Sequence, residues 1–191
     1  MKRLLLITGD LATGKSTFAH MLSQRYRIPV FCKDTIKEVL GDCIGFADRQ
    51  ENLRLSRASV QMMAYLFSAL SRQEEGLILE ANFRQPELEQ LRHLAQEQDC
   101  RVLTLSLQGE VEILHRRYLR RISQENRHPV HLSPRMEQLA DFADYVRRGR
   151  ELTIPGEVIS ITADDFSYQS DAALLQSIDA FMTPITVNKT E

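Results

Sequence analysis

The chain has 191 residues, of which 43% are hydrophobic and 26% are charged. This length and usage fit one globular domain, since a domain takes about 150 residues, and they exclude a wholly disordered chain. The formal net charge is −2, so no overall positive field would draw the protein to nucleic acid or to anionic lipid. Any affinity for phosphate is therefore expected to be local.

The sequence also carries no sign of a membrane or secreted protein. No stretch approaches the roughly 20 apolar residues of a membrane span, and the first residues lack the pattern of a signal peptide. The three cysteines, Cys32, Cys43 and Cys100, are odd in number and contain no CxxC pair. This argues against a disulfide framework or a zinc site. We expect a cytoplasmic protein, and nothing in the sequence indicates its oligomeric state.

Five short β-type segments alternate with longer helical patterns, at 3–8, 28–32, 77–80, 101–107 and 157–161. Residues 4–7 and 77–79 are continuously apolar, which is typical of parallel strands buried on both faces. The alternation predicts an α/β fold with a five-stranded parallel sheet flanked by helices. No repeat or flexible linker divides the chain. We therefore expect one domain over 1–183 and a polar C-terminal tail over 184–191.

Local helix signals agree with this division. Thr35 and Glu38 have the spacing of a capping box. Gln85-Pro86 and Ser133-Pro134 each place a proline where a helix would begin. Segment 53–72 has an apolar stripe at helical spacing, which we expect to pack on the sheet. The stripe consists of Leu55, Ala58, Met62, Tyr65, Leu66 and Ala69.

Residues 9–16 fit the pattern GxxxxGK[ST] of a P-loop. They follow an apolar strand and precede a helix expected over 15–26, which is the context that this loop requires. Gly9 and Gly14 permit close backbone approach, so that successive N–H groups and the positive end of the helix dipole can bind phosphate oxygens. The predicted nucleotide-binding residues are Gly9, Asp10, Leu11, Ala12, Thr13, Gly14, Lys15, Ser16 and Thr17.

Two side chains of this loop have predicted chemical roles. Lys15 is expected to contact the β- and γ-phosphates, and the Ser16 hydroxyl is expected to ligate Mg²⁺. The only Asn-Lys pair, Asn188-Lys189, lies in the terminal tail, so no element that reads guanine accompanies the loop. The sequence thus predicts a P-loop NTPase fold with ATP and Mg²⁺ as cofactors.

Asp34 follows the second predicted strand. Ligands gather at the carboxyl ends of parallel strands, so its side chain is expected to face the same crevice as the P-loop. A carboxylate there could accept the proton of a substrate hydroxyl while that oxygen attacks the γ-phosphate. The alternative interpretation is that Asp34 only caps the helix expected over 35–40.

The P-loop, Lys33-Asp34-x-x-Lys37 and Leu79-Glu80-Ala81-Asn82-Phe83 resemble motifs of P-loop kinases related to polynucleotide kinase, chloramphenicol phosphotransferase and zeta toxin. AAA-domain ATP-binding proteins belong to the same group. The resemblance covers nearly the whole chain, and it implies that Asp34 is the base that activates the acceptor hydroxyl. It also implies that Glu80 helps to hold Mg²⁺ or orients the acceptor, although several relatives have the shorter Asp there. An exposed strand-end carboxylate is the other interpretation of Glu80.

The resemblance further implies an arginine-bearing lid that closes over the phosphates. Residues 114–129 contain five arginines and one acidic residue, Glu125, and we expect the lid over about 115–132. Arg117 and Arg121 are four residues apart, so both guanidinium groups could reach the triphosphate from one helix face. A solvated basic helix is the alternative. Residues 162–166 occupy the place where related kinases line the adenine pocket, and they are equally typical of a polar turn.

These observations predict an ATP-dependent phosphotransferase that acts on a hydroxyl of a small-molecule acceptor. The expected catalytic residues are Lys15, Asp34, Arg117 and Arg121, and the expected metal ligands are Ser16 and Glu80. A kinase for nucleosides, nucleotides or polynucleotide ends is one alternative, and a non-kinase ATPase or nucleotide-dependent switch is another. A polynucleotide would need a basic track beside Asp34, whereas 41–52 holds three acidic residues and one arginine.

Two further interpretations concern the surroundings of Asp34. Helices between residues 41 and 75 are expected to shape the acceptor pocket, with four aromatic residues as possible walls: Phe46, Tyr65, Phe67 and Phe83. Lys37 would pair with Glu80, touch the substrate or remain a solvated helix charge. His128 and His131 are separated from any carboxylate or cysteine in the nearby sequence and break the helical pattern with Pro129, so metal ligation by this pair is disfavoured.

Overall fold

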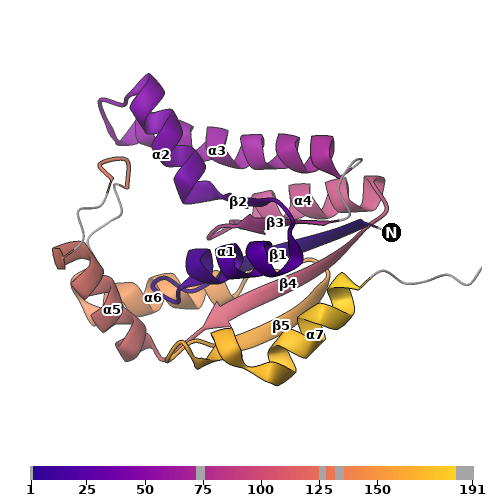
Figure 1. Ribbon diagram of the computed structural model, residues 1–191. Helices are drawn as coiled ribbons and strands as arrows, with labels where there is room; N and C mark the ends of the chain where they lie inside the picture. Colours follow the sequence, from indigo (N-terminus) through magenta and orange to yellow (C-terminus); the bar gives the residue numbers. More distant parts are fainter. Residues whose placement is uncertain (1, 72–75, 125–127, 132–135, 184–191) are drawn as a thin grey trace, which may run out of the picture.

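The computed structural model describes residues 2–71, 76–124, 128–131 and 136–183. Its centre is a five-stranded parallel sheet in the order β2-β3-β1-β4-β5 (Figure 1). The strands are β1 (Lys2–Gly9), β2 (Val30–Cys32), β3 (Gly76–Glu80), β4 (Cys100–Gln108) and β5 (Glu157–Thr162). All five predicted segments are strands, and the predicted α/β fold class is confirmed.

Helices surround this sheet. They are α1 (Lys15–Tyr26), α2 (Lys33–Ile44), α3 (Arg49–Leu70), α4 (Gln85–Glu97), α5 (Val111–Gln124), α6 (Leu139–Arg150) and α7 (Ala172–Met182), with the 3₁₀ helix η1 (Ser167–Ser170). The helix predicted over 15–26 and the helix start at Gln85-Pro86 are confirmed. Among the described residues, no helix is long and apolar enough to cross a membrane.

The central strand β1 explains why its sequence is continuously apolar. Successive side chains of a strand point to opposite faces, and here both faces are covered. Leu5 and Ile7 pack with residues of α1 and α7, whereas Leu4 and Leu6 pack with residues of α3 and α4. Figure 1 shows α1 and α7 on one side of the sheet and α3 and α4 on the other. Burying each of these side chains stabilises the fold by about 1.5–3 kcal/mol.

The capping box predicted at Thr35 and Glu38 is wrong. Helix α2 already begins at Lys33, directly after β2, with Cys32 at the N-cap position. Glu38 instead accepts a hydrogen bond from His131, so its carboxylate is used in a tertiary contact. The predicted helix start at Ser133-Pro134 and the polar tail 184–191 lie outside the described residues.

The apolar stripe predicted for segment 53–72 is also wrong in its orientation. Met62 and Tyr65 are exposed, and the buried residues of α3 are Asn52, Leu55, Ser59, Val60, Met63, Ala64 and Phe67. Apolar residues occur on several faces of this helix, so their spacing alone did not select the buried face. Phe67 belongs to the core beneath α3 rather than to an acceptor pocket, and Tyr65 faces away from the core.

Helices α5 and α6 form a small layer of their own at the carboxyl end of the sheet (Figure 1). Leu114 and Tyr118 of α5 pack against Phe142 and Val146 of α6, with Met136 in the same cluster. Helix α5 contains residues 115–124 of the segment predicted as a lid, whereas residues 125–127 and 132 of that segment lie outside the described residues. The layer stands next to the P-loop, because Leu11 and Ala12 pack against the same cluster.

Candidate active site

The P-loop lies between the end of β1 and the start of α1. Gly9 has a φ of 122°, and a Cβ at this position would lie 2.0 Å from the Leu107 carbonyl oxygen. Gly14 has a φ of 84° and caps α1 without a side chain. Both positions therefore require glycine for conformation and for space. Tyr168 fixes the loop from the other side by donating from its hydroxyl to the Thr13 carbonyl over 2.8 Å.

Lys15 is buried at the start of α1 and folds back over the loop. Its ammonium donates to the Asp10 carbonyl and to the Thr13 hydroxyl. Burial lowers the pKa of Lys15, and the negative charges of Glu80, Asp10 and Asp34 oppose this change. A desolvated ammonium among backbone N–H groups is suited to bind a polyanion, because phosphate oxygens would add negative charge directly beside it.

Ser16 and Glu80 come together although they are far apart in sequence. The Ser16 hydroxyl donates to the Glu80 carboxylate over 3.0 Å. Glu80 ends β3, next to β1, and only 5% of its surface is exposed. This excludes the interpretation of Glu80 as an exposed strand-end carboxylate. Burial raises the pKa of Glu80, while Lys15 and the Ser16 hydrogen bond lower it in part.

This pair of oxygen donors fits a magnesium ion. Mg²⁺ prefers oxygen ligands and usually takes one or two from the protein, with phosphate oxygens and water for the remainder. Within the described ranges, no three side chains from His, Cys, Asp and Glu form a cluster that could hold a metal without such help. Ser16 and Glu80 are thus the residues that would hold Mg²⁺ next to a nucleotide.

Asp34 faces this site from the first turn of α2. It shares with the P-loop a cavity of about 610 Å³, which we call the P-loop cavity. Its charge raises the pKa of both Lys15 and Glu80, as a smaller contribution than burial. Leu11 to Thr17 line the same cavity, together with Glu80 and Arg121. The structure thus brings Asp34, Lys15, Ser16, Glu80 and Arg121 to one place.

Lys37 is neither a solvated helix charge nor the partner of Glu80, and a contact of Lys37 with the substrate stays a prediction. It is buried, and its ammonium donates to the Asn52 side-chain oxygen over 2.9 Å. The Asn52 amide in turn donates to the Val130 carbonyl over 2.7 Å. Burial lowers the pKa of Lys37. Although Lys37 also lines the P-loop cavity, its hydrogen bond joins α2 to α3 and, through Asn52, to the segment 128–131.

The two lid arginines of α5 have different surroundings. Arg121 lines the P-loop cavity, and its positive charge contributes to the lowered pKa of Lys15, after burial. Arg117 does not line this cavity. It donates to the carbonyls of Ala163 and Asp164, just after β5, and its guanidinium lies 4.5 Å from the centre of the Phe166 ring. Arg117 thus contacts the segment 162–166, whereas Arg121 lies on the side of the P-loop cavity where phosphate groups would bind.

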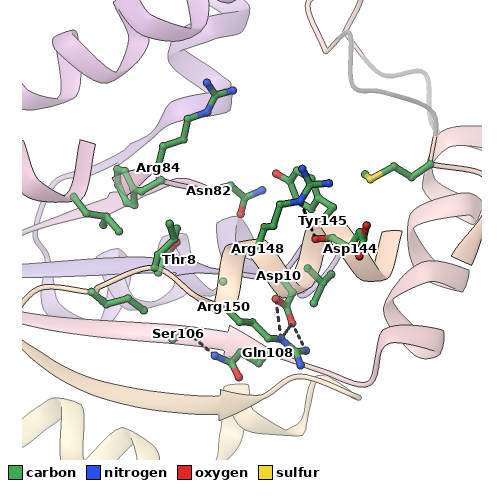
Figure 2. Close-up of a pocket in the computed structure, with 18 of the residues that line it drawn as sticks. Thr8, Asp10, Asn82, Arg84, Ser106, Gln108, Asp144, Tyr145, Arg148 and Arg150 are labelled. Atoms are coloured by element: carbon green, nitrogen blue, oxygen red, sulfur yellow. Dashed lines mark hydrogen bonds and ion pairs between the residues drawn. The ribbon is translucent and has the colours of Figure 1, made fainter. Parts of the chain in front are cut away.

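Asp10, another P-loop residue, points away from the phosphate side. Its carboxylate forms an ion pair with Arg150 of α6 at 2.6 Å and accepts from the Gly109 N–H. Figure 2 shows this pair at one side of a second cavity. Asp10 thereby ties the P-loop to α6. The sequence carried no signal for this partner, because 140 residues separate the two side chains.

Sequence reasoning also missed Asn82, Arg84 and Tyr145, which line the P-loop cavity. Asn82 belongs to the motif Leu79-Glu80-Ala81-Asn82-Phe83 after β3, and Arg84 is the first residue after this motif. Their position at the carboxyl end of a parallel strand is a signal that could have identified both. Tyr145 lies on α6, and burial raises the pKa of its hydroxyl, with Arg84 and Asp34 as charged neighbours.

A family model described as an AAA domain matches residues 4–145, which include the P-loop, Asp34, Glu80 and both lid arginines. The chain belongs to this AAA domain family. No curated protein sequence matches it.

Solved structures resemble this AAA domain over nearly its whole length. A protein from Chloroflexus aurantiacus J-10-fl, described provisionally as a kinase, is 27% identical, with a TM-score of 0.80 over 96% of this chain and 99% of that one. The tunicamycin resistance protein of Deinococcus radiodurans is 19% identical, with a TM-score of 0.62 over 95% and 96%. Shikimate kinase from Bacteroides thetaiotaomicron is 16% identical, with a TM-score of 0.58 over 95% and 99%. The fold is thus that of P-loop kinases.

Proposed function

We propose that the protein transfers the γ-phosphate of Mg-ATP to a hydroxyl group of a small-molecule acceptor. The observation that carries this proposal is the single P-loop cavity that joins Lys15, Ser16, Glu80, Arg121 and the carboxylate of Asp34. A nucleotide switch would not need a general base for an acceptor hydroxyl, whereas a kinase would. The fold shared with proteins described as kinases supports the same reaction class.

The loop after β5 indicates which way the adenosine end of the nucleotide would point. Phe166 lies next to Gly14, since a Cβ on Gly14 would come within 2.9 Å of its ring. Arg117 lies over the same ring. With the triphosphate on the P-loop, the adenosine end would extend toward 163–168, where a flat ring and a guanidinium plane can stack on a base. The acceptor would then approach from the opposite side, where Asp34 lies.

The reaction follows from these positions. Asp34 accepts the proton of the acceptor hydroxyl while the oxygen forms a bond to the γ-phosphorus. The bond from the γ-phosphorus to the β–γ bridging oxygen breaks, and ADP leaves. Lys15 and Arg121 donate hydrogen bonds to phosphate oxygens and stabilise the charge of the transition state. Ser16 and Glu80 would hold a Mg²⁺ ion, which would supply neutralisation of phosphate charge.

The experiment is to measure ADP release from Mg-ATP with and without a pooled library of hydroxylated metabolites, nucleosides and antibiotics. Wild-type protein should release ADP faster with the right acceptor. Asp34→Asn should retain ATP affinity and lose most of the acceptor-dependent rate, roughly 100-fold or more, because the general base is removed. Asp48→Asn is the matched control, since Asp48 caps α3 outside the P-loop cavity and Asn caps as well.

The same measurement separates the alternatives. Slow hydrolysis that no acceptor stimulates, and that Asp34→Asn leaves unchanged, would favour the ATPase or switch. Stimulation by nucleosides or by 5′-hydroxyl oligonucleotides alone would favour the nucleoside or polynucleotide kinase. Location in the cytoplasm stays a prediction from the sequence.

A further inference from the structure

A buried ion pair joins the P-loop to the last turn of α6. The Asp10 side chain is only 2% exposed, and Arg150 approaches it from the end of the helix. The Arg150 guanidinium donates to the Asp10 Oδ2 atom from Nε and from a terminal nitrogen, over 3.2 and 2.6 Å. Figure 2 shows the two side chains facing each other. A carboxylate so far from water is costly without a cation, so the pair holds Asp10 in one place.

Gly109, just after β4, completes this arrangement. Its N–H donates to the Asp10 carboxylate over 3.2 Å, and its carbonyl accepts from Arg150 over 2.6 Å. The Asp10 N–H in turn donates to the Leu107 carbonyl over 2.8 Å. Asp10 is thus bound to groups outside the P-loop through both its side chain and its N–H. These contacts fix where the Asp10 backbone lies, and with it the place from which its carbonyl group projects.

The Asp10 carbonyl faces the inside of the P-loop. It accepts from the Lys15 ammonium and, over 2.9 Å, from the Thr13 hydroxyl. The Thr13 hydroxyl oxygen also accepts from Lys15, over 3.3 Å. The position of the Lys15 ammonium, which we expect to bind phosphate, therefore depends on where this carbonyl lies. One residue connects α6 on one side to the phosphate-binding lysine on the other.

Neither member of the ion pair lines the cavity where a nucleotide would bind. Residues 11–17 of the P-loop line the P-loop cavity. Asp10 and Arg150 line the second cavity instead, which has a volume of about 530 Å³. An effect of Arg150 on nucleotide binding is therefore expected to pass through Asp10, and not through a contact with the nucleotide.

We propose that Arg150 is a positioning residue for nucleotide binding, which holds Asp10 and thereby keeps the P-loop in the form that binds phosphate. A loop that is already held in its binding conformation gives up less conformational freedom when the ligand arrives, so its affinity is higher. This role goes beyond the proposed function, since no step of phosphate transfer involves Arg150. It rests only on the nucleotide binding that precedes the transfer.

Substitution of both partners, singly and together, tests this role. Mg-ADP is titrated by calorimetry into wild type, Arg150→Gln, Asp10→Ala and the double variant, well below the Tm of each protein. Each single substitution should raise the Kd for Mg-ADP about tenfold, since each removes charge-assisted hydrogen bonds. The double variant should bind as each single variant does, because both substitutions break the same connection. Arg150→Lys retains the charge without the planar guanidinium, so its Kd should lie between those of wild type and Arg150→Gln.

Arg147→Gln is the matched control. Arg147 lies in the same turn of α6 and forms ion pairs with Asp144 and Glu151, at 3.2 and 3.0 Å. It lines neither the P-loop cavity nor the second cavity. The control thus removes ion pairs from the same helix without a connection to the P-loop. Its Kd for Mg-ADP should equal that of wild type.

The Kd values separate the roles that Arg150 could have. If Arg150 contacted the nucleotide directly, its substitution would weaken binding by the same factor in wild type and in Asp10→Ala, and this result would overturn the proposal. An ion pair that only stabilises the fold would lower Tm and leave Kd unchanged on substitution, which would overturn it as well.

The same titrations keep this proposal distinct from the proposed function. If wild type binds Mg-ADP but transfers no phosphate to any acceptor, the phosphotransferase proposal fails, while the tenfold rise of Kd in Arg150→Gln would still support the role of Arg150. If wild type binds no Mg-ADP at all, both proposals are overturned.

Discussion

Glu80 is a carboxyl group whose pKa burial raises, even though the charge of Lys15 offsets part of this effect. The folded protein therefore holds the Glu80 proton more tightly than the unfolded chain does. Stability from this group is fully present below the ordinary carboxyl pKa, and it is lost as the pH rises through the raised pKa of the folded state. Above that range, the ionised carboxylate reduces the free energy of unfolding.

Glu80→Gln should consequently raise Tm in the ligand-free protein, because glutamine stays uncharged. The gain over wild type should be larger at pH 8 than at pH 5. Each kcal/mol corresponds to about 2–4 °C in a chain of this size. Thermal melts of both proteins across this pH range check the sign. A gain in Tm that shrinks as the pH rises would contradict the raised pKa of Glu80. In the same variant, Mg²⁺-dependent nucleotide binding should be lost, because a metal ligand is removed.

The lid arginines give a second prediction at the residue scale. Arg121→Ala should lower kcat by about 100-fold or more, because Arg121 lines the P-loop cavity and would stabilise charge on the transferring phosphate. Arg117→Ala should instead raise the KM for ATP about fivefold, since it removes a cation–π contact with Phe166 and two carbonyl contacts. Arg120→Ala, at an exposed position of α5, is the control.

Steady-state kinetics with ATP and the acceptor varied separately measure both effects. If both arginines act on the triphosphate, as their shared helix face suggested, the two substitutions would lower kcat alike. Equal losses of kcat would therefore contradict the division of roles between the phosphate side and the loop after β5.

At the scale of elements, the segment 128–131 is fastened to α2 and α3. The Val130 side chain is buried against Gly41 of α2, and its carbonyl accepts from Asn52 of α3. His128 and His131 contact the α2 carboxylates Asp42 and Glu38 at 2.9 and 2.7 Å. These contacts connect the segment 128–131, which follows α5 in the chain, to α2 and α3, the helices next to the P-loop cavity.

Gly41→Ala tests the contact between α2 and the segment 128–131, and Gly149→Ala is the matching substitution at a helical glycine without such a contact. A Cβ on Gly41 would lie 2.9 Å from a Val130 methyl carbon, so Gly41→Ala must displace the segment 128–131. It should speed hydrogen exchange there and raise the acceptor KM. Gly149→Ala meets no atom within 4 Å and should stabilise the protein by about 0.5–1 kcal/mol. Equal exchange at 128–131 in Gly41→Ala and wild type would show that this contact does not hold the segment.

The elements also show which structural features the sequence could predict. The strands and the P-loop were predictable because their signals are local: a buried apolar run, or a glycine pattern at a strand end. Glu80 was predictable because parallel strands end at one edge, which brings it to Ser16. The buried face of α3 was not predictable from its sequence, because α3 packs against α2 and α4 as well as against the sheet. The contacts of Arg117, Asn52 and Asp10 depend on residues that are distant in sequence.

At the scale of the whole molecule, the P-loop cavity and the second cavity both lie at the carboxyl edge of the sheet. The P-loop cavity reaches from α1 to α2 and α3, and the second cavity, which Asp10 and Arg150 line, lies between α4 and α6. Tyr145 of α6 lines both cavities, and α5 packs on α6. A ligand in the P-loop cavity therefore contacts several elements at once.

Nucleotide binding should thus stabilise the molecule as a whole, and magnesium should be required for most of this gain. A ligand present at 100 times its Kd contributes about 2.7 kcal/mol, which corresponds to about 5–11 °C in Tm. We expect a gain of this size with Mg²⁺ and a non-hydrolysable ATP analogue. With EDTA the gain should be much smaller, because the buried Glu80 carboxylate would then face the triphosphate without a cation between them. In Ser16→Ala the Tm gains with Mg²⁺ and with EDTA should differ less than in wild type, since one of the two expected metal ligands is removed. Equal gains with Mg²⁺ and EDTA in wild type would show that Ser16 and Glu80 do not form a metal site.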